Sequence, residues 1–177
     1  MEYGKFYLDV DYVKELLECY YDQDLAKTSE YYYGSVIVQE KGKRSELTSR
    51  AYASISYSLK NEAGEELKIT MEYDPVDKLI SQIYLKGDVE DGKYFLENIF
   101  PYFVQETYFT EDEMNTLFAP SLEAYEKQDT LNAEEDEHIS DNVYLSNHAK
   151  FNLSVDTMVG ADYKYISLRL KSTGYYW

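Results

Sequence analysis

The side chains best suited to catalysis or metal binding are few in this chain of 177 residues, which has two histidines and one cysteine. We expect His138 in an acidic loop and His148 at the start of a strand, and neither belongs to a metal-binding spacing such as H-E-x-x-H. Cys19 has no partner for an internal disulfide, and a lone thiol in a helix usually packs rather than reacts. These residues predict no catalytic group, no metal ligand and no cofactor.

Signatures of the common reaction classes are missing as well. The sequence contains no G-x-S-x-G, no Walker loop and no G-x-G-x-x-G. The run from Asp88 to Gly92 fails the spacing of a calcium loop and better predicts a helix N-terminus, where the dipole favours acids. We therefore expect a protein without enzymatic activity, although 34 Asp and Glu residues leave paired-carboxylate chemistry open.

Charge is distributed very unevenly. The formal net charge is -17, and residues 106–141 carry twelve acids against one base, Lys127, so this stretch holds -11 of the total. Such a surface suits a basic partner and disfavours nucleic acids and anionic membranes. We expect a basic protein as partner, no nucleic acid, and no direct insertion into a membrane, because no apolar run approaches the length of a span.

Hydrophobic periodicity predicts the first elements that position these residues. Apolar residues at helical spacing predict a helix from Asp9 to Tyr21, which Asp9 can cap. Aromatic, β-branched or alternating runs then predict four strands, the first of which ends at the basic segment Lys41–Arg44. Short links between them predict an antiparallel meander of Tyr31–Val38, Ala51–Leu59, Leu67–Tyr73 and Leu79–Leu85.

Helical spacing returns after Asp88. Pro101 should kink or restart the first of these helices, and a capping box at Thr110 begins another that Pro120 should break or bend. Residues 126–142 show no period and are expected to be a solvated acidic loop. Alternation in Phe151–Val155 and Ile166–Leu170 predicts a closing hairpin.

Together these elements predict one α+β domain over residues 1–177, with a curved antiparallel sheet of about six strands and helices packed on one face. The other face would be open to water and rich in Tyr and Ser. Tyr offers large contact area for little lost rotamer freedom, which suits recognition, although it is also simply a good strand residue. The candidate partner-binding residues are Glu111, Asp112, Glu123, Glu126, Tyr52, Tyr163 and Tyr165, with an ordinary solvated side chain as the alternative at each.

Two segments of the middle third of the sequence are Leu79–Asp88 and Leu96–Pro101. With these segments, this Tyr-rich, acidic α+β chain resembles the TipC-like immunity proteins of streptococci. The resemblance implies an immunity protein that neutralises a secreted LXG toxin of the type VII secretion system, a toxin that degrades the cell-wall precursor lipid II. It also implies a location outside the cytoplasmic membrane, with tethering by a segment that this sequence lacks. Without the resemblance, we expect a cytoplasmic protein.

Two other functions remain open at this point. A phage-type acidic mimic of nucleic acid could inhibit a host DNA-binding protein, although such a mimic should spread its acids over a whole face. An enzyme or small-ligand carrier could use a cavity between sheet and helices, although no motif indicates a reaction class.

Overall fold

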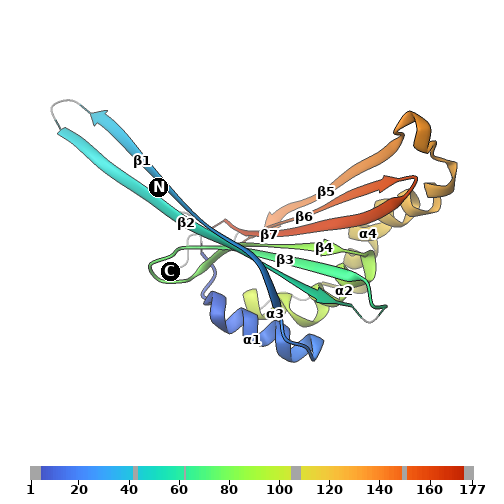
Figure 1. The fold of residues 1–177 in the computed structure, drawn as a ribbon, viewed down its shortest axis with the longest axis horizontal. Coiled ribbons are helices and arrows are strands. Elements are labelled where there is room, and N and C mark those ends of the chain that lie inside the picture. The colour runs from blue at the N-terminus through green and yellow to red at the C-terminus, as the bar shows by residue number, and fades with distance from the viewer. Residues whose placement is uncertain (1–4, 42–43, 62, 105–108, 149–150, 174–177) are drawn as a thin grey trace.

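The computed structural model describes residues 5–41, 44–61, 63–104, 109–148 and 151–173, without side-chain surroundings for 35–51 and 146–148. The strands form one antiparallel sheet in the order β1-β2-β3-β4-β7-β6-β5, curved and not closed, with helices on one face (Figure 1). The predicted α+β class is therefore confirmed. The strands are β1 (Ala26–Lys41), β2 (Arg44–Lys60), β3 (Glu66–Tyr73), β4 (Ile80–Gly87), β5 (His138–His148), β6 (Phe151–Gly160) and β7 (Tyr163–Ser172).

The first hairpin is longer than the sequence predicted. β1 and β2 stay paired from Ala26 opposite Ser58 to Lys41 opposite Arg44, so the pairing extends to both ends of the basic segment. β3 pairs with β2 only from Ala53 onward. The outer half of the hairpin is therefore a two-stranded ribbon that projects beyond the sheet (Figure 1).

The sheet has seven strands rather than about six, because the expected acidic loop ends earlier than predicted. β5 runs from His138 to His148, so His138 begins this strand rather than lying in a loop, and His148 ends it rather than starting one. β5 is an edge strand that pairs only with β6. Its inward residues, Ile139 and Val143 among them, are only half-buried, which explains why the alternation is weak in the sequence.

The helix starts follow the predicted caps. α1 (Val10–Tyr21) begins where the Asp9 carboxylate accepts the backbone N–H of Asp11 at 2.7 Å. Capping boxes at Asp88 and Thr110 begin α2 (Val89–Asn98) and α4 (Glu111–Glu126). The predicted restart at Pro101 is confirmed, because α3 (Phe100–Phe103) begins there after α2 ends.

Of the two effects predicted for Pro120, a break or a bend, the break is wrong, because α4 continues through Pro120 to Glu126. A proline inside a helix costs about 3 kcal/mol, mainly through one lost hydrogen bond and a clash with the preceding turn. Burial of Leu117, Phe118 and Ser121 on either side of Pro120 offsets that cost. Two short 3₁₀ turns, η1 (Gln128–Thr130) and η2 (Ala133–Glu135), then lead into β5.

The core lies between the helices and one face of the sheet. α2 approaches both α4 and β7 so closely that a Cβ on Gly92 would lie 2.6 Å from Ile166 Cδ1 and 2.9 Å from Phe118. The largest fully buried side chains include aromatic rings from β6 and from three helical segments, which fixes the helical layer against the sheet. They are Phe6, Phe95, Phe100, Phe118 and Phe151.

The opposite face of the sheet, here called the open face, carries the alternate residues of the same strands. None of the described helices packs on it, since their buried residues all belong to the other face. Tyr, Ser, Thr and long charged side chains dominate this face, as alternation requires. Its members include Tyr31, Tyr33, Tyr52, Ser54, Lys68, Thr70, Tyr84, Lys86, Tyr144, Tyr165, Arg169 and Lys171.

A buried hydroxyl pair tests how α4 docks on β6. The Ser121 and Thr157 hydroxyl oxygens lie 2.7 Å apart with both residues buried. Ser121→Ala should lower the unfolding free energy by about 1–3 kcal/mol, because it leaves the Thr157 hydroxyl without its partner. The double variant with Thr157→Val should recover most of that loss in urea denaturation. Equal stability of wild type and the single variant would contradict this docking.

Candidate functional site

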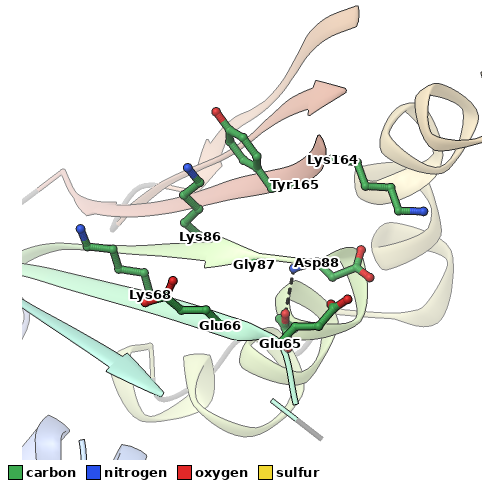
Figure 2. Close-up of a pocket in the computed structure, with 9 residues that line it drawn as sticks. Glu65, Glu66, Lys68, Lys86, Gly87, Asp88, Lys164 and Tyr165 are labelled. Atoms are coloured by element: carbon green, nitrogen blue, oxygen red, sulfur yellow. Dashed lines mark hydrogen bonds between the residues drawn. The ribbon is translucent and has the colours of Figure 1, made fainter. Parts of the chain in front are cut away.

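A hollow of about 380 Å³ opens where the end of β4 meets the start of α2. Figure 2 shows Lys68 and Lys86 on one side of it, beside the Tyr165 ring, and Glu65 and Asp88 on the other. The hollow therefore carries charges of both signs on each side, since Glu66 lies on the open face with the two lysines and Lys164 lies on the side of Asp88. Glu66, Asp91, Gly87 and Lys164 complete its lining.

Asp91 is the most deeply buried acid of this hollow, with 7% of its surface exposed. Its Oδ2 atom accepts the Asp88 backbone N–H at 2.8 Å and the Asn61 amide at 3.2 Å. Burial raises the pKa of Asp91, and the nearby charges of Asp88 and Glu65 add to this rise, although the two hydrogen bonds oppose it. Asp91 thus closes the N-terminus of α2 at an electrostatic cost.

The side chains that line the hollow are carboxylates, lysines and one tyrosine. Among its described lining residues there is no histidine, cysteine, serine or threonine. Within the described parts of the chain, no three His, Cys, Asp or Glu side chains lie close enough to hold a metal ion. Its chemistry is that of charge recognition, with both signs displayed side by side.

Exposed acids gather at one end of the sheet, where α4 ends and β5 begins. We call this region the acidic end, and all of its carboxylates are exposed. Lys127 and His138 are the basic or titratable residues within it, and Lys127 Nζ pairs with Glu123 at 2.6 Å, which lowers the pKa of Glu123. Its members are Glu123, Glu126, Asp129, Glu134, Glu135, Asp136, Glu137 and Asp141.

Tyr163 lies at the same end. The turn between β6 and β7 is fixed to η1 because the Gln128 amide donates to the Gly160 carbonyl at 3.1 Å. A Cβ on Gly160 would lie 2.4 Å from the Tyr163 ring, so this ring lies directly over the glycine. Gly160 in turn pairs with His138, the residue that follows the acids of η2. Tyr163 therefore stands within the acidic end, 43% exposed.

The structure brings four of the seven predicted partner-binding residues to this end. Glu123 and Glu126 lie near the end of α4, and Tyr163 stacks on Tyr165 with ring centroids 6.1 Å apart. The other three lie elsewhere. Glu111 and Asp112 are exposed in the first turn of α4, at the far end of that helix, and Tyr52 is on β2.

Several exposed aromatic residues were not singled out from the sequence. Tyr33 stacks on Tyr52 with centroids 4.8 Å apart, and Tyr31 lies 6.3 Å from Tyr33, so these three form one cluster on the open face. The cross-strand register places them together, and no sequence pattern predicted that register. Elsewhere, a hollow of about 490 Å³ beside α1 and α3 is lined by Tyr7, Leu8, Asp9, Tyr12, Pro101 and Tyr102.

Two carboxylates should change stability with pH in opposite directions. The raised pKa of Asp91 means that its ionisation destabilises the fold, so the Asp91→Asn variant should gain stability relative to wild type as pH rises through that pKa. The lowered pKa of Glu123 means that its charge stabilises the fold, so the Glu123→Gln variant should lose relative stability as pH rises. Urea denaturation from about pH 3 to pH 7 measures both trends. Trends of the same sign would contradict the assignment.

Among the described helices, none is both long and apolar enough to cross a membrane. Comparison of the chain with protein-family models, with curated proteins and with solved structures finds no match. The surfaces of the chain itself are therefore the evidence on its function. Among them, the acidic end brings together the largest number of predicted partner-binding residues.

Proposed function

We propose that this protein binds a basic protein partner through its acidic end and thereby neutralises it, as an immunity protein neutralises a secreted antibacterial toxin. One observation carries the proposal. Exposed carboxylates from α4, from the two 3₁₀ turns and from β5 lie at the same end of the sheet as Tyr163, an exposed ring that is fixed over Gly160. This arrangement combines a charged rim with an aromatic anchor, as tight protein interfaces do.

Charge would govern how fast the partner arrives. Eight exposed carboxylates lie at the acidic end, and Lys127 is the lysine among them. A field of one sign attracts a partner of the other sign and raises the association rate, and salt screens this attraction over about 10 Å. The partner's contact surface is therefore expected to be rich in Lys and Arg, as is a cleft that binds an anionic substrate.

Aromatic side chains would hold the complex once it has formed. Tyr163 is supported by Tyr165, whose ring stacks on it, and Tyr144 on β5 is 54% exposed. Tyr is a preferred anchor because it buries a large area with few rotatable bonds to order. Loss of such an anchor mainly raises the dissociation rate.

The inhibitor role draws on the resemblance of Leu79–Asp88 and Leu96–Pro101 to the TipC-like immunity proteins. On that basis the partner is a secreted LXG toxin that degrades lipid II, and the protein acts outside the cytoplasmic membrane. The exposed acids of residues 123–141 gather at one end of the sheet rather than spreading over a face, which favours a protein partner over mimicry of nucleic acid. Duplex DNA should accordingly fail to compete with this chain for its partner.

Charge reversal at the acidic end tests the proposal. An immunity protein is normally encoded beside its toxin, so the product of the neighbouring gene is the binding partner to assay, by surface-based kinetics at low and high salt. The double variant Glu126→Lys/Glu135→Lys should lower the association rate about tenfold at low salt and much less at high salt. Tyr163→Ala should instead raise the dissociation rate.

The matched control is Glu15→Lys, which reverses an exposed acid on α1, away from the acidic end. It should leave both rates within about twofold of wild type, because a distant charge is screened. Binding that is indifferent to salt, or equally sensitive to Glu15→Lys, would contradict binding through the acidic end.

A further inference from the structure

Four cations lie on the open face of three adjacent strands. Lys68 on β3 is directly opposite Lys86 on β4, while on β7 Arg169 is opposite Tyr84 and Lys171 is opposite Gln82. All four side chains are exposed. We call Lys68, Lys86, Arg169 and Lys171 the cationic strip, because they are neighbours across β3, β4 and β7.

Among the described residues, no ion pair involves a member of this strip, although the chain carries a net charge of -17. Ion pairs among the described residues use other lysines, such as Lys5 with Asp74 and Lys14 with Glu18. The open face does contain three acids near the strip, but each is engaged by a neutral hydrogen-bond donor. Glu66, Glu72 and Asp156 accept hydrogen bonds from Ser58, Gln82 and Asn142 respectively.

The pair Lys68 and Lys86 is unfavourable within the chain itself. Like charges directly opposite on neighbouring strands destabilise a sheet. A single Glu at either position would remove that repulsion in a chain that is already rich in acids. The repulsion acts between two exposed lysines whose ammonium groups point to the same side of the sheet (Figure 2).

Tyrosine rings hold two members of the strip in place. The Lys86 Nζ atom lies 3.8 Å from the centroid of the Tyr165 ring, and Arg169 lies 5.1 Å from that of Tyr84. Such contacts orient a cation without neutralising it, since the ring carries no net charge. The strip is therefore preorganised for an anion that approaches from outside.

We propose that the cationic strip binds an acidic segment of a partner protein. Charge complementarity selects an anionic occupant, and the Tyr-rich sheet face, which none of the described helices covers, gives it an exposed surface on which to lie. A short acidic segment can contact the strip alone. A nucleic acid would extend past the strip toward the three acids beside it and into the field of a strongly acidic chain. This inference is independent of binding at the acidic end.

The test measures fluorescence anisotropy with a labelled ten-residue peptide of alternating Glu and Ser, and with a labelled ten-nucleotide oligothymidine. The wild-type chain should bind the peptide more tightly than the oligonucleotide. Lys68→Gln/Lys86→Gln and Arg169→Gln/Lys171→Gln should each weaken peptide binding about tenfold, because each removes two cation contacts. The matched control Lys14→Gln/Lys93→Gln makes the same charge change on α1 and α2 and should shift it less than about twofold.

Each other outcome overturns the inference. A wild-type chain that does not bind the peptide, or a control variant that weakens binding as much as the strip variants, shows that the strip is not a specific site. Tighter binding of the oligonucleotide shows that the occupant is a nucleic acid. The thermal midpoint of Lys68→Gln/Lys86→Gln should not fall below that of wild type, because the substitution relieves repulsion between like charges, so lost binding cannot be assigned to unfolding.

Discussion

Burial of one face of the sheet, and one face only, is the constraint on which the rest of this molecule depends. The helices pack on the alternate residues of β3, β4, β6 and β7, and buried phenylalanines fill the space between the two layers. Because side chains on a strand point alternately to the two faces, every residue that goes into this core sends its neighbours to the open face. The Tyr, Ser and Lys residues of that face are exposed as a consequence. The same packing positions α4 so that the acidic segment follows its C-terminal end and leads into β5.

The same constraint separates charge. Acids concentrate where α4, the 3₁₀ turns and β5 meet, at the end of the sheet, and all of them are exposed. Cations without ion-pair partners in the described residues lie instead on the open face of β3, β4 and β7. A chain of net charge -17 thus has surfaces of both signs, and residues of both signs also line the hollow beside α2. Such a distribution can orient a partner as well as attract it, since each sign repels the wrong approach.

The sequence predicted most of the fold because strong local signals coincide with the elements. Caps at Asp9, Asp88 and Thr110 begin three helices, and clean alternation marks β3. Prediction failed where tertiary packing decides. Burial around Pro120 keeps α4 continuous, and β5 alternates weakly because an edge strand is only half-buried. The candidate binding surfaces were harder to predict from the sequence than the helices and strands. The acidic segment was visible as a run of charge, but the stacking of Tyr33 on Tyr52 and the position of Lys68 opposite Lys86 depend on register between strands.

The proposed function requires that a protein partner covers the acidic end. Hydrogen exchange of this chain, followed by mass spectrometry with and without the product of the neighbouring gene, measures this directly, because backbone amides beneath an interface exchange more slowly. The account predicts protection from the end of α4 through the start of β5, and at the turn between β6 and β7 that carries Tyr163. Protection confined to α1 and the β1–β2 hairpin, with none at the acidic end, would contradict it.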